Sequence, residues 1–236
     1  MKFKVVFFDG YGTLFEDAMI PLRETCDRII RKNRLDMDRN AFLEASDRHF
    51  FPIIRGAFVT LREADIVSLG RLFEEWNLAD APHGYVDALF ERFNAAPAYP
   101  EVRGTLEKLN GCATGIVSNA DVENIDGALK VNGLRFPVVV TSEGVRCYKP
   151  APAIFREALG LAGCGPEEAL YVGDSQEDDI VGARGVGMRV AWLNRRGDAL
   201  KPGAPAPDYE IESLEEVLEI QEIRKSGNQE RNHCKS

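Results

Sequence analysis

The sequence predicts an α/β protein, a doubly wound parallel sheet interrupted by an all-helical insert. Three observations support this fold class. An apolar run over residues 5–8 ends abruptly at Asp9. Strand and helix patterns alternate from residue 101 onward, which is typical of a parallel sheet. The region between them shows only helical periodicity.

The first strand is expected to be buried on both faces, because residues 5–8 are all apolar. It ends in the motif Asp-Gly-Tyr-Gly-Thr-Leu at residues 9–14, a carboxylate in a glycine-interrupted turn. Open α/β sheets bind ligands beyond the carboxyl ends of their strands, so Asp9 is a candidate catalytic residue. The alternative is a turn aspartate that only caps a helix.

The insert is expected to consist of four helices with no strand between them, because apolar residues recur there at three- and four-residue spacings. The expected helices span residues 20–34, 40–52, 61–77 and 83–94. A small-residue and proline-rich stretch over 94–100 is typical of a linker. We therefore predict a core of residues 1–15 and 97–225, an insert of residues 16–96 and a disordered polar tail over 226–236.

The second half is expected to alternate regularly between helices and strands. The expected helices are 101–110, 122–131, 151–160, 177–185 and one from Ser213, and the expected strands are 113–117, 137–141, 169–172, 188–193 and 208–211. Polar residues that directly follow these strands should lie at the same sheet edge as Asp9.

Two motifs of this half offer groups that could bind an anion. Ser118 and Asn119 follow a strand and precede a helix, so a hydroxyl and a helix N-terminus would point outward together. Lys149 is held out of a helix by Pro150. The alternatives are an ordinary helix cap and a solvated lysine.

The third motif of this half, which is the fourth in the chain, is acidic. Residues 174–179 contain four carboxylates, which repel one another. Acids favour a helix N-terminus, but Asp174 lies at the strand end, where a cation would relieve its charge. Magnesium prefers oxygen ligands and is often held by one or two carboxylates, here Asp9 and Asp174. A purely acidic helix cap is the alternative.

The amino-acid composition narrows the range of expected binding partners. The formal net charge of −9 argues against nucleic acid and anionic membranes and favours a small-molecule substrate. No run approaches the roughly 18 apolar residues of a membrane span, and no export signal is expected. The five cysteines contain no Cys-x-x-Cys pair, which predicts a cytoplasmic protein without zinc or disulfides. We expect a monomer or a homodimer.

The four motifs, in this order and at this spacing, resemble the haloacid dehalogenase-like (HAD) hydrolase superfamily. The resemblance covers the core, and the insert corresponds in place and helical character to the cap of that family. It implies a Rossmann-like fold, a magnesium cofactor in the phosphatases of the family, and an aspartate that forms a covalent ester with the substrate.

Carried over by position, the resemblance implies that Asp9 is the nucleophile and that Ser118 binds the phosphoryl oxygen. Lys149 would neutralise Asp9 and the substrate. The implied metal ligands are Asp9, Asp174, Asp179 and the carbonyl group of Tyr11. Gly10, Thr13 and Asn119 are expected to complete the substrate-binding set.

The first and the last of the four motifs indicate different reactions. Tyr11 stands where the phosphatases carry an acid-base aspartate, and a tyrosine there resembles the L-2-haloacid dehalogenases, which need no metal. The motif at residues 173–179 has the metal-binding phosphatase form. Without a cation, Asp174 would raise the pKa of one carboxyl and impair the nucleophile. The prediction is therefore a magnesium-dependent phosphatase, with a haloacid dehalogenase and a weakly active or non-catalytic ligand-binding relative as alternatives.

The insert should exclude water and select the substrate. Its candidate contacts are Phe15, Arg23, Arg55 and Arg62. We expect Phe50, Phe51 and Trp76 to belong to the apolar core of the insert.

Overall fold

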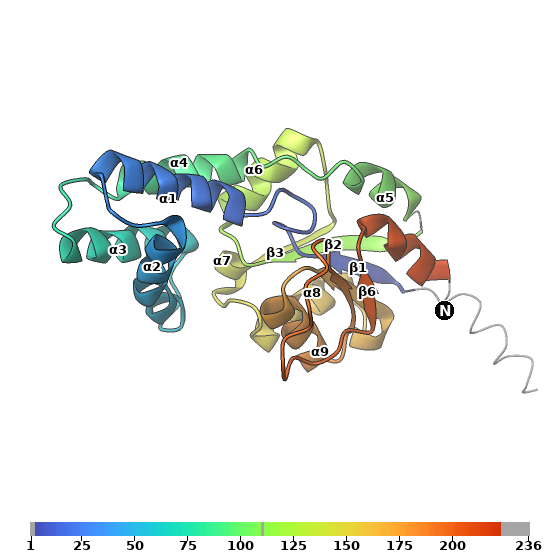
Figure 1. Cartoon of the computed structure of the whole chain (residues 1–236). Helices are drawn as coiled ribbons and strands as arrows, with labels where there is room; N and C mark the ends of the chain where they lie inside the picture. The colour runs from blue at the N-terminus through green and yellow to red at the C-terminus, as the bar shows by residue number, and fades with distance from the viewer. Residues whose placement is uncertain (1–2, 110, 223–236) are drawn as a thin grey trace, which may run out of the picture.

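The computed structural model describes residues 3–109 and 111–222, in which six strands form one parallel sheet of order β3-β2-β1-β4-β5-β6. The strands are β1 (Val5–Phe8), β2 (Ala113–Ser118), β3 (Val138–Thr141), β4 (Ala169–Gly173), β5 (Arg189–Leu193) and β6 (Tyr209–Ile211). Helices flank the sheet, so the predicted α/β fold class is confirmed (Figure 1).

The central strand β1 is buried on both faces, as its apolar sequence predicts. Successive side chains point to opposite faces, and each of its four residues is at most 1% exposed. Phe8 pairs in register with Ile116 of β2 and with Val172 of β4. The residues that follow these three neighbouring strands therefore meet at one edge of the sheet.

Helices cover both faces of the sheet. Phe8 packs in one apolar cluster with residues of α5 and α6, and Phe7 packs in another with residues of α8 and α9. The core helices are α5 (Val102–Lys108), α6 (Val122–Asn132), α7 (Ser142–Val145), α8 (Pro152–Ala162) and α9 (Val181–Gly185). The short α7 was not predicted. It is one turn long, too short for a periodic apolar pattern.

The helix predicted over 177–185 is present, but its first half has a different geometry. Residues Gln176–Ile180 form a wider π-helical turn, and α9 begins only at Val181. The carboxylate of Asp179 is turned inward and accepts a hydrogen bond from the Ser175 amide at 2.9 Å. Such wide turns often occur at functional sites.

The insert folds around its own apolar cluster, which includes Ile29, Phe42, Leu72 and Phe90. Its helices are α1 (Met19–Asn33), α2 (Arg39–Ile54), α3 (Leu61–Glu75) and α4 (His83–Asn94). They gather on one side of the sheet (Figure 1), and none of the described helices is long and apolar enough to cross a membrane.

Two chain segments connect the insert to the core, and they lie side by side. Phe15 and Ala98 form an antiparallel bridge. The Glu16 amide donates to Pro97 O at 2.9 Å, and the Tyr99 amide donates to Leu14 O at 3.0 Å. We propose that residues 16–96 form a cap domain hinged at this pair of segments, and we call them the cap below. The tail predicted over 226–236 lies outside the described residues.

Candidate active site

Asp9 lies directly after β1 and is only 7% exposed. Its backbone amide donates to Val172 O at 2.9 Å, which fixes the start of the turn against β4. One carboxylate oxygen, Oδ1, accepts a hydrogen bond from Lys149 Nζ at 2.7 Å. Burial raises the pKa of Asp9, and the Lys149 ammonium opposes that rise.

Lys149 connects three buried groups. Its Nζ lies 2.7 Å from Asp9 Oδ1, 2.6 Å from Asp179 Oδ1 and 3.1 Å from the Tyr171 hydroxyl. Burial alone would lower the pKa of Lys149, but the Asp179 and Asp9 carboxylates together raise it above its ordinary value. The lysine is therefore a fixed cation beside the proposed nucleophile.

Tyr171 belongs to this cluster, although sequence reasoning did not select it. Its hydroxyl lies 2.8 Å from Asp179 Oδ1 and 2.9 Å from Val117 O. The ring is fully buried and packs edge-on against Phe155. A signal was present in the sequence, since a tyrosine in an otherwise apolar buried strand needs a partner for its hydroxyl.

Three carboxylates converge at the sheet edge. Asp9, Asp174 and Asp179 each place one oxygen within 4.8 Å of the others. Burial, followed by the charges of Asp9 and Asp179, raises the pKa of Asp174 to about 8. The Thr13 hydroxyl donates to Asp174 Oδ1 at 3.3 Å, so Thr13 orients this carboxylate.

Gly12 allows Asp174 to approach the catalytic turn. Its φ of +89° is in a region that L side chains rarely adopt. A Cβ atom at this position would lie 2.6 Å from Asp174 Oδ2. The glycine is therefore required both by the backbone conformation and by the nearby carboxylate.

The donor set fits a hard divalent cation such as magnesium, because all three side chains offer carboxylate oxygens and one ammonium group contacts the cluster. The Asp179 oxygens already accept hydrogen bonds from Lys149, Tyr171 and the Ser175 amide. Asp9 and Asp174 are thus the better candidates for direct ligands, and Asp179 orients the lysine.

Ser118 and Asn119, at the end of β2, differ in what they contact. A Cβ atom on Gly10 would lie 2.9 Å from Ser118 Oγ, so this hydroxyl faces the turn that carries Asp9. The side-chain amide of Asn119 instead forms hydrogen bonds with the backbone of the loop that carries Lys149. Its Oδ1 accepts from the Lys149 amide at 2.6 Å, and its Nδ2 donates to Lys149 O at 3.2 Å.

The Tyr11 hydroxyl is directed at the cap. It donates to Phe93 O, near the end of α4, at 3.1 Å. The ring packs between Phe15 and Phe93, with centroid separations of 6.0 and 5.4 Å. Burial raises the pKa of Tyr11, so the hydroxyl stays protonated at neutral pH.

Asp121 connects the core to the cap. It precedes α6, but its carboxylate accepts hydrogen bonds from the Leu61 and Arg62 amides at the start of α3, at 2.8 and 3.0 Å. Nearby, the Tyr148 hydroxyl donates to Val59 O at 2.7 Å. Sequence reasoning considered Asp121 only as a cap of its own helix, because the α3 N-terminus approaches it only in the folded chain.

Two of the four predicted cap contacts serve other purposes. Phe15 is buried in the hinge, and Arg62 forms ion pairs with Asp87 and Glu123 at 2.8 and 2.5 Å. Arg55 lines a cleft between the cap and the core. Phe51, predicted to be core, is 39% exposed because it faces the same cavity instead.

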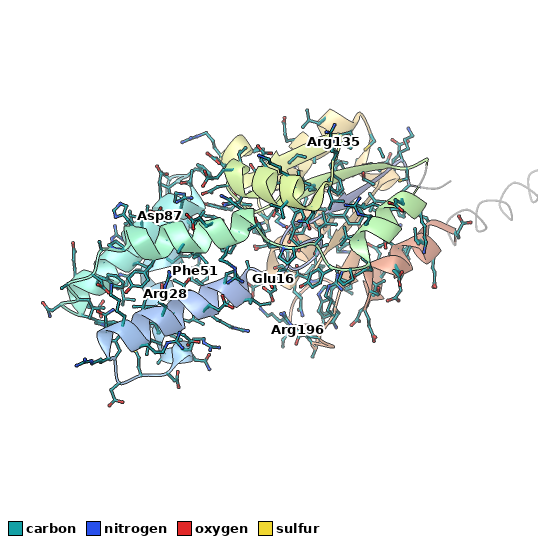
Figure 2. All side chains as sticks on the ribbon, turned by 90° about the horizontal axis from the view of Figure 1, so that it is seen from above. Glu16, Arg28, Phe51, Asp87, Arg135 and Arg196 are labelled. Atoms are coloured by element: carbon teal, nitrogen blue, oxygen red, sulfur yellow. The ribbon has the colours of Figure 1, made fainter. Side chains whose placement is uncertain are left out.

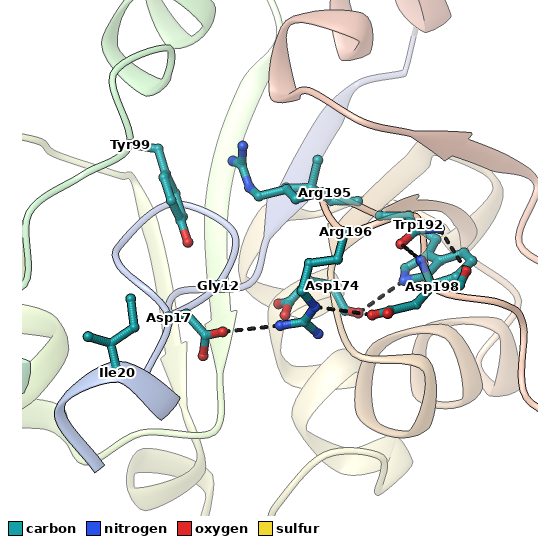
Figure 3. A pocket seen from close by; sticks show the side chains of 11 residues that line it. Gly12, Asp17, Ile20, Tyr99, Asp174, Trp192, Arg195, Arg196 and Asp198 are labelled. Atoms are coloured by element: carbon teal, nitrogen blue, oxygen red, sulfur yellow. Dashed lines mark hydrogen bonds and ion pairs between the residues drawn. The ribbon is translucent and has the colours of Figure 1, made fainter. Parts of the chain in front are cut away.

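A small cavity of about 180 Å³ lies beside Asp174 (Figure 3). Arg196 lines this cavity and pairs with Asp17 and Asp198 at 3.2 and 3.1 Å. Arg195 lies over the Tyr99 ring at 4.0 Å. The cavity therefore lies where the start of the cap, at Asp17 and Ile20, meets the core beside Asp174.

A parallel sheet with side chains for chemistry gathered beyond the carboxyl ends of its strands is typical of an α/β enzyme. The family model described as haloacid dehalogenase-like hydrolase matches residues 3–187. The chain belongs to this HAD-like hydrolase family, as its motifs predict.

Some of the similar proteins are named as dehalogenases and others as phosphatases or pyrophosphatases. The chain is 25% identical over 223 residues to haloacetate dehalogenase H-2 of Moraxella sp. (strain B), covering 93% of this chain and 98% of the relative. It is 31% identical over 176 residues to pyrophosphatase PpaX of Bacillus cereus (strain AH820), covering 72% and 75%. A crystal structure of a HAD phosphatase from Thermococcus onnurineus matches with a TM-score of 0.65 and 31% identity, covering 92% and 97%.

Proposed function

We propose that the protein is a magnesium-dependent phosphatase that hydrolyses a small phosphorylated metabolite through an aspartyl-phosphate on Asp9. The convergence of Asp9, Asp174 and Asp179 within 4.8 Å carries this proposal. A halide leaves carbon without a cation or a proton, so displacement of a halide does not require a metal site at Asp174. A phosphatase gains a site for a cation that also neutralises the substrate phosphate.

In this reaction a carboxylate oxygen of Asp9 attacks phosphorus, and the bond from phosphorus to the leaving oxygen breaks. Lys149 keeps Asp9 ionised through its 2.7 Å contact, and Ser118 donates a hydrogen bond to a phosphoryl oxygen. Water then attacks the phosphorus of the aspartyl-phosphate, which releases inorganic phosphate and restores Asp9. Magnesium, held by Asp9 and Asp174 with the Tyr11 carbonyl, would supply charge neutralisation and orient the phosphate.

The leaving group receives no proton from Tyr11 in this proposal, because the Tyr11 hydroxyl donates to Phe93 O. Loss of general acid catalysis typically costs about 10²- to 10⁴-fold in rate. The cost is small for leaving groups that are stable as anions. We therefore expect aryl esters, acyl phosphates and anhydrides to react faster than alkyl phosphates.

An L-2-haloacid dehalogenase is the second candidate. The tyrosine of the first motif and the similarity to the haloacetate dehalogenase over nearly the whole chain favour it. In that reaction Asp9 would displace the halide from carbon, and water would hydrolyse the resulting ester.

The two reactions differ in product and in metal dependence. Phosphate release from p-nitrophenyl phosphate, with magnesium or with a chelator, is compared with halide release from L-2-chloropropionate. We expect phosphate release that the chelator stops, and no activity in Asp9→Asn. Halide release that persists in chelator would establish the dehalogenase, and release of neither product would favour a ligand-binding relative.

A further inference from the structure

A second cleft opens between the cap and the core, beside Lys149 and Asp178. Its volume is about 530 Å³, within the range of roughly 300–1,000 Å³ that is typical of small-molecule sites. The end of α2 and the loop after it form one wall, from Phe51 to Phe58. The loop from Arg146 to Ala151 forms the other wall.

Each wall contributes one arginine that lies over an aromatic ring. Arg55 Cζ is 5.3 Å from the centroid of the Phe51 ring, and Arg146 Cζ is 5.2 Å from that of Phe58. Across the described ranges, neither guanidinium forms an ion pair with a carboxylate. Stacking occupies the face of a guanidinium and leaves its N–H edge available to an oxyanion.

Each of the two acidic residues that line the cleft already contacts another side chain. Glu177 pairs with Lys201 at 2.8 Å. Asp178 Oδ2 accepts from Asn119 Nδ2 at 3.4 Å, on the side of the lysine loop. Asp178 keeps its negative charge, but the two arginines outnumber it, so the remaining charge of the cleft is positive. In the cavity beside Asp174, by contrast, Arg196 is paired with two aspartates.

Two aromatic rings contribute an apolar surface to the lining of the cleft. The Phe58 and Tyr148 rings lie 5.3 Å apart at an interplanar angle of 34°. The Tyr148 hydroxyl is occupied by its hydrogen bond to Val59 O, so the ring presents apolar carbon to the cleft. Such a surface suits a flat or apolar group.

We propose that this cleft binds the leaving group of the substrate, and that Arg55 and Arg146 together bind an oxyanion, a carboxylate or a second phosphate, on that group. The inference rests on the proposed function, because the scissile phosphate must lie at Asp9, Ser118 and Lys149. Arg55 belongs to the cap and Arg146 to the core. An anion bound by both therefore favours the arrangement in which the cap covers the site.

The test compares three aryl phosphates that differ in the group at the para position, and the arginine variants separate the effect of the cleft from that of the leaving group. Phenyl phosphate, 4-carboxyphenyl phosphate and 4-phosphonophenyl phosphate share one scissile bond type, and the two anionic arms distinguish a carboxylate from a phosphate-like group. We expect kcat/KM to favour an anionic substrate, and we expect Arg55→Met and Arg146→Met each to lower that preference by about tenfold or more. Lysine at either position should restore part of the preference.

Arg135→Met is the matched control. Arg135 is an exposed arginine of the core that forms no ion pair among the described residues and does not line this cleft (Figure 2). This variant should keep the full preference. An equal loss in Arg135→Met would mean that overall charge, and not the cleft, selects the anion, and would overturn the inference.

Binding to Asp9→Asn separates the inference from the reaction. Isothermal titration calorimetry should show that 4-carboxyphenyl phosphate or its phosphono analogue binds about tenfold more tightly than phenyl phosphate, and that adding Arg146→Met removes the difference. If this preference exists but the wild type releases no phosphate, the phosphatase proposal fails and the cleft assignment stands. If phosphate is released but the arginine variants keep the wild-type preference, the cleft assignment fails and the phosphatase stands.

Discussion

The Tyr11 hydroxyl donates a hydrogen bond to the carbonyl oxygen of Phe93 at 3.1 Å, and so joins the catalytic turn to the end of α4. The same ring packs between Phe15 and Phe93. Tyr11 therefore acts as a contact between core and cap in our proposal, and proton transfer to the leaving group has no side chain assigned to it.

Replacing Tyr11 should change which leaving groups are accepted. Tyr11→Asp should raise kcat/KM for an alkyl phosphate relative to an aryl phosphate by about 10²-fold, because a carboxyl group could protonate the departing alkoxide. Tyr11→Phe is the control, with an unchanged ratio and a loss of about 1 kcal/mol in the free energy of unfolding. Phosphate release and urea denaturation measure both effects, and an unchanged ratio in Tyr11→Asp would refute the role we assign.

Lys149 should be essential for both stability and turnover. Lys149→Met leaves Asp9 and Asp179 buried without their cation, which should cost about 3–5 kcal/mol in the free energy of unfolding. The double variant Lys149→Met/Asp179→Asn should regain part of that stability but no activity. Urea denaturation and phosphate release test this, and a single variant as stable as the wild type would contradict it.

Gly12→Ala should weaken magnesium binding. The added Cβ would lie 2.6 Å from Asp174 Oδ2, at a φ of +89°. We expect the magnesium concentration for half-maximal phosphate release to rise by about tenfold or more. Changes to residues that position a metal ligand typically lower metal affinity by about 10- to 100-fold. Gly84→Ala is the control, because a Cβ there meets nothing within 4 Å, and it should leave the metal requirement unchanged.

Asp65, half-buried in α3, should make stability depend on pH. Burial, with a smaller effect of the Asp121 charge, raises the pKa of Asp65 from 3.8 to about 7. The folded state therefore holds this proton more tightly than the unfolded chain. The stabilising contribution is complete below about pH 4 and is lost as the pH rises through about 7.

Asp65→Asn should accordingly reduce the fall in the free energy of unfolding between pH 5 and pH 8, measured by urea denaturation. Asp36→Asn, at an exposed aspartate of the cap, is the control and should show the full wild-type fall. Equal pH profiles for the wild type and Asp65→Asn would show that burial of Asp65 has no such effect.

The sheet and the four cap helices could be predicted because their signals are local. The apolar run of β1 and the spacing of apolar residues in α1 to α4 place these elements within about two residues of their observed ends. Asp9, Ser118 and Asp174 were found for the same reason, since each follows an apolar strand directly.

The remaining parts of the site depend on contacts between distant segments. Tyr171 reaches Lys149 only because β4 lies beside β1, and Asp121 meets the start of α3 across a separation of 60 residues. Arg146 lies on a loop without apolar periodicity, so nothing in its neighbourhood distinguishes it from a solvated arginine. Such residues are identified only when the chain is folded.

The paired segments at Phe15 and Ala98 limit how the cap can move. Because the two connections are hydrogen-bonded to each other, they form a short ribbon that resists twisting and sliding more than two separate strands of chain would. For the hinged cap that we propose, the displacement that remains is a rocking about an axis through the ribbon. Such a rocking would widen and narrow the cleft that Arg55 lines between the cap and the core.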